Sequence, residues 1–205
     1  MKKNFLILIL ILLIPIKAFA LIEVDITRGN LNPLPLAVSP LSIDDKSKKS
    51  FEKILERENI GSEISTIVEN NLRTSGLFNP LSKEAFLQAP DIANLKPRFE
   101  DWNLIKAQAL ITGKVTYVDE KLRVEFRLWD VLAAKEMMAL AFTTVPSNWR
   151  RVGHIISDKV YKRLTGEKGY FDTRIIYVAE EGPKTQRKKR LAIMDQDGAN
   201  NKFLT

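Results

Sequence analysis

The sequence contains no cysteine and only one histidine, His154, among its 205 residues. Without cysteine the chain cannot form disulfides, thiolate nucleophiles or cysteine metal sites, so a hydrophobic core must supply its stability. The histidine falls inside an expected helix, and no third group is spaced with it and Ser157 to form a catalytic triad. The HExxH, P-loop and GxGxxG motifs are also missing. We therefore expect no catalytic residue, no cofactor and no metal site, and a packing or hydrogen-bonding role for His154.

Long apolar runs are limited to one, Phe5 to Ile14, close to the N-terminus. Two lysines precede it and an A-x-A site ends at Ala20, which is the pattern of a cleaved export signal over residues 1–20. A run of about 10 apolar residues is too short for the roughly 20 that cross a bilayer. We expect export to the periplasm, a mature chain that starts at Leu21, and no membrane span after cleavage.

The formal net charge of +7 falls to +4 when the three lysines of the export signal are removed. This mild excess is not a nucleic-acid signature, and we expect no nucleic-acid partner. The densest basic run is Gln186 to Arg190 (QRKKR). It is either a hairpin tip kept soluble by its charge or a contact for phosphate or anionic lipid.

Alternation and helical periodicity outline the first part of the mature chain. Strands are expected at Ile22 to Thr27 and Leu36 to Val38, and a charged loop at Asp44 to Lys49. One apolar stripe runs along Ile60 to Ser75, which predicts a helix that Gly76 ends in the left-handed conformation.

The middle of the chain predicts a short helix, a meander and a long helix. The short helix covers Pro97 to Ile105, and the long one runs from Ser147, its expected N-cap, to Leu164. Its expected buried face carries Trp149, Val152, Ile156, Val160 and Leu164. Polar links separate the strands of the meander, which are Ala109 to Val118, Leu122 to Leu128 and Met137 to Val145.

The chain changes character after Gly166. Arg174 to Val178 and Arg190 to Met194 predict strands around a polar loop, and Lys202 to Thr205 begins another strand. Asp195 to Gly198 (DQDG) resembles the start of a calcium loop, but an EF-hand needs glycine at the sixth position, where Asn200 stands. A turn between strands is the better interpretation.

The expected fold class is α/β, with a mixed sheet packed by two to three helices, followed by an incomplete β-propeller blade. Residues 21–168 would form the α/β domain, and residues 169–205 a linker and the first, incomplete blade. Repeat architectures bury each unit against its neighbours, so a lone blade would leave its faces uncovered.

The segment Leu21 to Thr27 is the strongest candidate for binding. Its alternating apolar face at a free N-terminus can dock on its own domain or add a strand to the sheet edge of another protein. Both possibilities are open from the pattern.

Three stretches resemble the TolB family: LRTSGLFNPL (72–81), GHIISDKVY (153–161) and KRLTGEKGYFDTRIIY (162–177). The family is the periplasmic component of the Tol-Pal envelope system, with an α/β domain followed by a β-propeller. The resemblance implies a non-enzymatic adaptor that links TolA to the lipoprotein Pal, with other outer-membrane proteins as further expected partners. It also implies roles in outer-membrane integrity, cell division and colicin import.

By the same resemblance, the mature N-terminal segment contacts the C-terminal domain of TolA. Carried over by position, the TolA-binding residues are Leu21, Ile22, Glu23, Val24, Asp25, Ile26 and Thr27. Pal docks on the family's propeller, which is nearly all missing here, so no Pal-binding residue is assigned. Two alternatives stay open, an envelope hydrolase with a propeller and a basic module that binds anionic glycolipid through Arg187 to Arg190.

Overall fold

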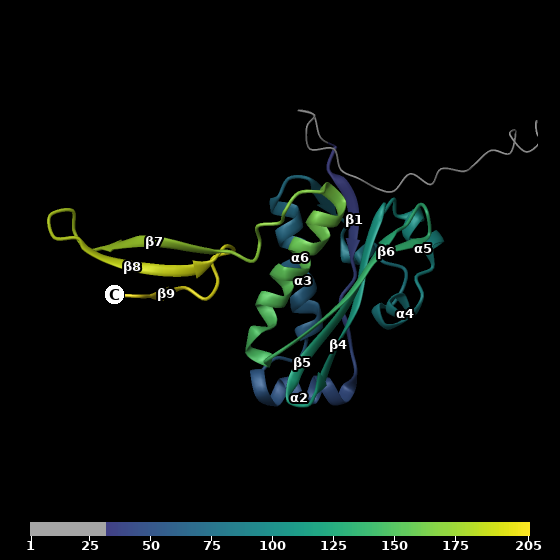
Figure 1. Ribbon diagram of the computed structural model, residues 1–205, viewed down its shortest axis with the longest axis horizontal. Coiled ribbons are helices and arrows are strands. Elements are labelled where there is room, and N and C mark those ends of the chain that lie inside the picture. The colour runs from purple at the N-terminus through teal and green to yellow at the C-terminus, as the bar shows by residue number, and fades with distance from the viewer. Residues whose placement is uncertain (1–31) are drawn as a thin grey trace, which may run out of the picture.

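The computed structural model describes residues 32–205. The expected export signal, residues 1–20, and the candidate binding segment, Leu21 to Thr27, lie outside this range. Figure 1 shows a larger body of helices around a mixed sheet and a separate small sheet near the C-terminus. None of the helices in the described range combines the length and the apolar character that crossing a membrane requires.

The larger sheet is mixed and has six strands, in the order β3-β1-β4-β5-β6, with β2 beside β4. β1 runs parallel to β3 and β4, whereas β4, β5 and β6 form the predicted antiparallel meander. Asp119 and Glu120 join β4 to β5 with φ values of 50° and 59°, as a tight two-residue hairpin turn requires. The strands are β1 (Leu34–Val38), β2 (Ser42–Ile43), β3 (Phe78–Pro80), β4 (Ala109–Val118), β5 (Lys121–Asp130) and β6 (Lys135–Thr144).

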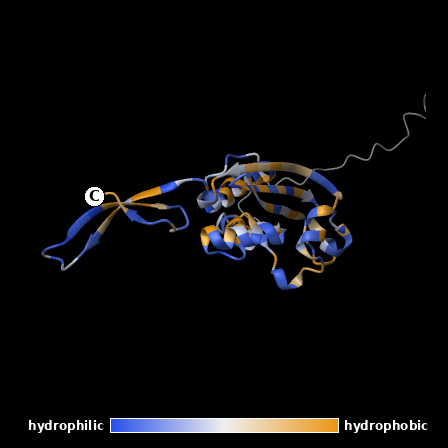
Figure 2. Ribbon diagram, turned by 90° about the horizontal axis from the view of Figure 1, so that it is seen from below, coloured by the Kyte–Doolittle hydropathy of each residue, from blue (hydrophilic) through white to orange (hydrophobic). Residues whose placement is uncertain are grey.

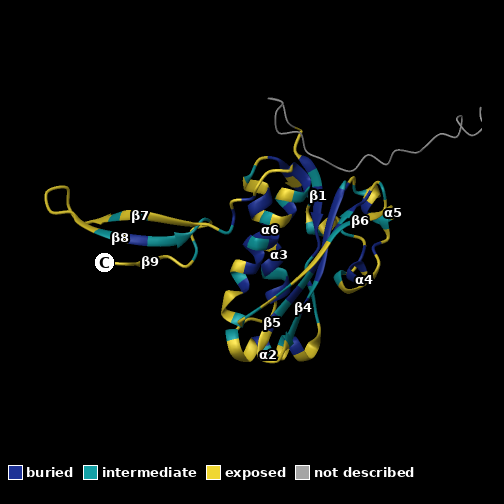
Figure 3. Ribbon diagram, viewed as in Figure 1, coloured by how far each residue is buried: buried dark blue, intermediate teal, exposed yellow. Residues whose placement is uncertain are grey.

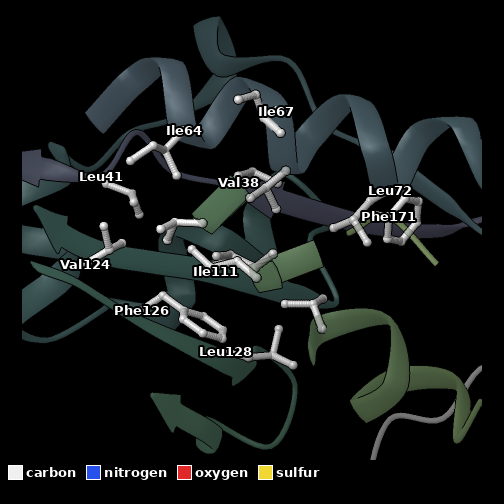
Figure 4. Close-up of a cluster of buried hydrophobic side chains, with 14 of the residues drawn as sticks. Val38, Leu41, Ile64, Ile67, Leu72, Ile111, Val124, Phe126, Leu128 and Phe171 are labelled. Carbon is white, nitrogen blue, oxygen red and sulfur yellow. The ribbon is translucent and has the colours of Figure 1, made fainter. Parts of the chain in front are cut away.

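Helices α3 (Ile60–Thr74) and α6 (Trp149–Thr165) pack together on one face of this sheet. The predicted apolar face of each helix is buried in the main core. There Ile64 and Ile67 of α3 lie across from Val38 and Ile111 of the sheet (Figure 4). Gly166 has a φ of +79° and ends α6, as the sequence predicts.

The opposite face of the sheet carries a smaller core around Trp102, which is 1% exposed. It is covered by α4 (Pro90–Leu95) and α5 (Phe99–Leu104), and a 3-10 turn, η1 (Lys83–Ala85), precedes them. α5 was expected, but α4 is too short to show a periodic pattern and was not.

Two local predictions were wrong. The expected loop Asp44 to Lys49 is the start of helix α2 (Asp45–Leu55), because the Asp44 carboxylate caps the backbone N–H of Ser47 at 2.9 Å and Phe51 is fully buried. Ser147 is not the N-cap of α6. It lies in a 3-10 turn, η2 (Pro146–Asn148), and Asn148 precedes α6 without a capping side-chain bond.

The second sheet is antiparallel and contains β7 (Arg174–Glu181), β8 (Lys188–Asp195) and β9 (Lys202–Phe203), which confirms the three predicted strands. The cross-strand register puts Ile176 opposite Ile193 on one face and Tyr177 opposite Ala192 on the other. Each face therefore carries apolar side chains among charged ones, and Figures 2 and 3 show hydrophobic and exposed segments in this sheet. Val178, for example, is 58% exposed.

The fold class is thus confirmed as a mixed sheet with packed helices followed by a small separate sheet, and residues 32–205 form no closed barrel or propeller. The division at residue 168 stays a prediction. Phe171, just beyond it, is fully buried in the main core.

Candidate functional site

The candidate TolA-binding residues, Leu21 to Thr27, lie outside the described residues. Polar side chains concentrate where the small sheet meets α3 and α6. Two segments form this junction, the linker from Gly166 to Thr173 and the turn from Asp195 to Gly198 between β8 and β9.

The linker is bound firmly to α6. The Asp158 carboxylate accepts hydrogen bonds from the backbone N–H groups of Phe171 (2.7 Å) and Asp172 (3.2 Å). Gly169 runs so close to Asp158 that a Cβ atom on it would lie 2.4 Å from Oδ1. Arg151 pairs with Asp172 at 3.0 Å. These contacts fix where the chain leaves the larger domain.

A buried polar network lies between α3 and α6. Asn71 Nδ2 lies 3.0 Å from His154 Nδ1 and donates to Ser157 Oγ at 2.9 Å. Ser157 Oγ in turn donates to the carbonyl of Gly153. Asn71 Oδ1 accepts from Nε2 of Gln196 at 2.8 Å, so the network continues into the β8–β9 turn. The expected hydrogen-bonding role of His154 is confirmed.

The orientation of the Asn71 and Gln196 amides sets which nitrogen of the imidazole carries the proton. Since Asn71 Oδ1 faces Gln196, its Nδ2 faces His154, and Nδ1 of the ring is an acceptor. The neutral ring therefore carries its proton on Nε2 in this arrangement. Burial lowers the pKa of His154, and this effect outweighs the opposing attraction of Asp197 and Asp195. His154 is accordingly neutral at neutral pH.

Carboxylates face the other ring nitrogen. Nε2 of His154 lies 3.6 Å from Oδ2 of Asp197, which also forms an ion pair with Arg150. Asp195 is close by, and its carboxylate accepts from Asn200 Nδ2 and lies 3.7 Å from Arg174 Nε. One ligand atom from each of His154, Asp195 and Asp197 can be chosen so that all three lie within 4.8 Å of one another. This group could hold a metal ion.

The DQDG segment itself is a turn, as predicted. The backbone N–H of Gly198 donates to the carbonyl of Asp195 at 2.9 Å, and Gly198 has a φ of +85°. The turn places Gln196 and Asp197 against the helices, a role that the sequence did not suggest.

The basic run Gln186 to Arg190 spans the end of the β7–β8 loop and the first residues of β8, and its charge is partly neutralised. Arg187 and Lys189 both pair with Glu180, and Arg190 pairs with Glu181. The hydrogen bond from Arg187 holds the pKa of Glu180 below its ordinary value. The guanidinium of Arg190 also stacks 3.7 Å above the ring of Phe203.

Sequence reasoning missed Asn71, Gln196 and Arg150. Asn71 offered a signal, since it falls in the apolar stripe of α3 beside Leu72, and a polar residue in such a stripe needs a buried partner. Gln196 offered none, because its partner Asn71 is 125 residues away.

Comparison with known proteins agrees with the fold. The family model described as the TolB amino-terminal domain matches residues 22–137, more than half of the chain. The Tol-Pal system protein TolB of Pelagibacter ubique (strain HTCC1062) is 85% identical over 197 residues. That match covers 96% of this chain and 44% of the relative, so the chain spans less than half the length of the curated relative it matches.

A solved structure shares the architecture. The crystal structure of TolB from Acinetobacter baumannii superposes with a TM-score of 0.69 at 24% identity, over 90% of this chain and 41% of the other. At that identity the likeness establishes a common fold. The family is shown by the family model, which matches more than half of the sequence: the chain belongs to the TolB family.

Proposed function

We propose that the chain acts as a non-enzymatic periplasmic adaptor of the Tol-Pal system, which binds the C-terminal domain of TolA through Leu21 to Thr27. Its membership of the TolB family is the observation that carries this proposal. The expected export signal supports the periplasmic location, and the alternating pattern of Ile22, Val24 and Ile26 supports strand addition. Roles in outer-membrane integrity, cell division and colicin import follow from the same family assignment.

The small sheet supports the second part of the adaptor role. Apolar side chains are exposed on both faces of this sheet, Ile175 on one and Ile176 on the other, and a neighbour on each face would cover them, as in a blade within a propeller. We therefore propose that residues 169–205 are a linker and the first, incomplete blade. Pal binding, in this proposal, belongs to propeller surface beyond this blade.

The two alternatives find less support. His154 and Ser157 are 3% and 0% exposed, and each is bonded to Asn71, so they offer a substrate no nucleophile and base. Glu180 and Glu181 form ion pairs with the basic run Gln186 to Arg190 and neutralise part of its charge. This weakens the attraction of the run for anionic glycolipid.

The test is calorimetric titration of the chain against the C-terminal domain of TolA from the same organism. Binding should disappear when residues 21–27 are deleted. It should weaken strongly when Ile22, Val24 and Ile26 are all changed to lysine, because strand addition uses the side chains on one face. The matched control changes Glu23→Gln and Asp25→Asn on the opposite face and should keep most of the affinity.

Two results would count against the adaptor assignment. Equal binding by the chain with and without residues 21–27 would move the TolA contact elsewhere. A lack of binding by every sample would mean that the family function does not extend to this chain.

A further inference from the structure

We propose that His154, Asp195 and Asp197 bind a divalent transition-metal ion of the zinc type, and that this ion clamps the β8–β9 turn to α6. The three ligand atoms lie within 4.8 Å of one another. One imidazole and two carboxylates suit Zn²⁺, with water as a fourth ligand. This inference is independent of the Tol-Pal function, because it concerns only side chains at the junction of the two sheets.

The second observation is an unpartnered nitrogen aimed at the carboxylates. The His154 side chain is 3% exposed, and within residues 32–205 its Nε2 finds no hydrogen-bond partner. Its nearest carboxylate oxygen, Asp197 Oδ2, is 3.6 Å away, longer than a hydrogen bond. Buried polar atoms are rarely left in this state, and a bound ion is one of the recognised explanations.

The surroundings of the ring are suited to metal binding. A ligating histidine usually donates its other N–H to an oxygen, which fixes the ring and raises its basicity. Turning the Asn71 amide by half a turn would let Oδ1 accept from Nδ1–H. The Ser157 hydroxyl, which now accepts from Asn71 Nδ2, would then turn from the Gly153 carbonyl to donate to Oδ1. Gln196 can turn its own amide and keep its bond to Asn71, since both amides have the same shape in either orientation. Nε2 would then present its lone pair to the ion.

Arg150 competes with the metal. Its guanidinium forms an ion pair with Asp197 Oδ2, and a metal ion must displace it or share the carboxylate with it. Its positive charge also repels a divalent ion at close range. The proposal therefore predicts that removing this charge strengthens metal binding, which a chance surface contact would not require.

The experiment titrates Zn²⁺ alone into the chain, purified without an affinity tag that contains histidine. We expect one ion per chain. Asp197→Asn and Asp195→Asn, both on the turn, should each weaken binding by about tenfold or more. Arg150→Gln should tighten it several-fold. The matched control is Arg151→Gln, which removes the same charge one residue away, where the partner is Asp172, and should change the affinity less.

A second measurement uses the unaltered chain. Because His154 is the only histidine, the ring ¹⁵N resonances can be assigned without variants. The proton should sit on Nε2 without metal, and Zn²⁺ should move it to Nδ1 as Nε2 becomes the ligand. Zinc should also raise the Tm of the chain, and Asp197→Asn should lose this rise.

The proposal is overturned by either of two results. One is the absence of binding at millimolar Zn²⁺ together with unchanged ring resonances. The other is binding that survives in Asp195→Asn and Asp197→Asn, which would identify an adventitious surface site.

Discussion

Gly153 of α6 faces Ile67 of α3 so closely that a Cβ atom on the glycine would lie 2.9 Å from Cγ2 of the isoleucine. The contact lets the two helices approach and brings Asn71 within reach of His154. Gly153→Val would force a helix to shift, and we expect a loss of about 1–3 kcal/mol in the free energy of unfolding. Urea unfolding followed by tryptophan fluorescence measures it.

The control for this variant is Lys159→Val at an exposed position of the same helix. A β-branched residue there costs less than about 1 kcal/mol, through helix propensity alone. Equal losses for the two variants would show that the close approach of α3 and α6 adds nothing to stability.

Asp158 ties the linker to α6, and its removal should loosen the junction. Asp158→Ala leaves the backbone N–H groups of Phe171 and Asp172 without their acceptor, so we expect a loss of about 1–3 kcal/mol in unfolding free energy. Hydrogen exchange should also speed up at these two amides. Arg151→Ala removes only an ion pair whose arginine side chain is 62% exposed, and should cost less than about 1 kcal/mol. An unchanged exchange rate at Phe171 in Asp158→Ala would contradict the proposed role.

The elements that the sequence predicted well are those whose helical or alternating pattern extends over many residues. The stripe from Ile60 to Leu72 and the alternation along β5 each depend on many residues, so no single side chain could mislead the assignment. The start of helix α2 was missed because its first residues are mostly charged or polar. One aromatic, Phe51, and one cap, Asp44, hold it in place, and a pattern needs more than that.

The candidate site was predictable only in part. The sequence identified the Asp195 to Gly198 turn and His154, but not that the two meet. Their contact depends on how α6 and the linker direct the small sheet, which is a property of packing and not of local pattern. The partner segment, Leu21 to Thr27, stays a prediction because it lies outside the described residues.

Gln88 satisfies the buried indole of Trp102, and we expect that losing it destabilises the smaller core. Its Oε1 accepts from Trp102 Nε1 and from the backbone N–H of Arg98, both at 3.0 Å. Gln88→Leu would leave the indole N–H buried without a partner and cost about 1–3 kcal/mol. Thermal and urea unfolding give the value.

A double-mutant cycle separates this bond from packing. Trp102→Phe removes the donor, so Gln88→Leu should cost less in the Trp102→Phe background than in the unaltered chain. The same cost in both backgrounds would assign the effect of Gln88 to its other bonds, to Arg98 and Lys96.

The Asp44 cap makes the stability of α2 depend on pH. The backbone N–H of Ser47 lowers the pKa of Asp44 from 3.8, so the folded state favours the ionised carboxylate. A depressed folded-state pKa adds stability above the unfolded pKa, and this stability is lost as the pH falls through the folded value. Asp44→Ala should therefore cost about 1 kcal/mol at pH 7. The difference from the unaltered chain should shrink as the pH falls below about 4.

The control is Glu52→Ala, which removes an exposed carboxylate from the same helix and should change stability by less than about 0.5 kcal/mol at every pH. Urea unfolding at several pH values gives the free energy of unfolding of each variant. If the cost of Asp44→Ala stays constant down to pH 2, the charge of Asp44 does not stabilise the helix.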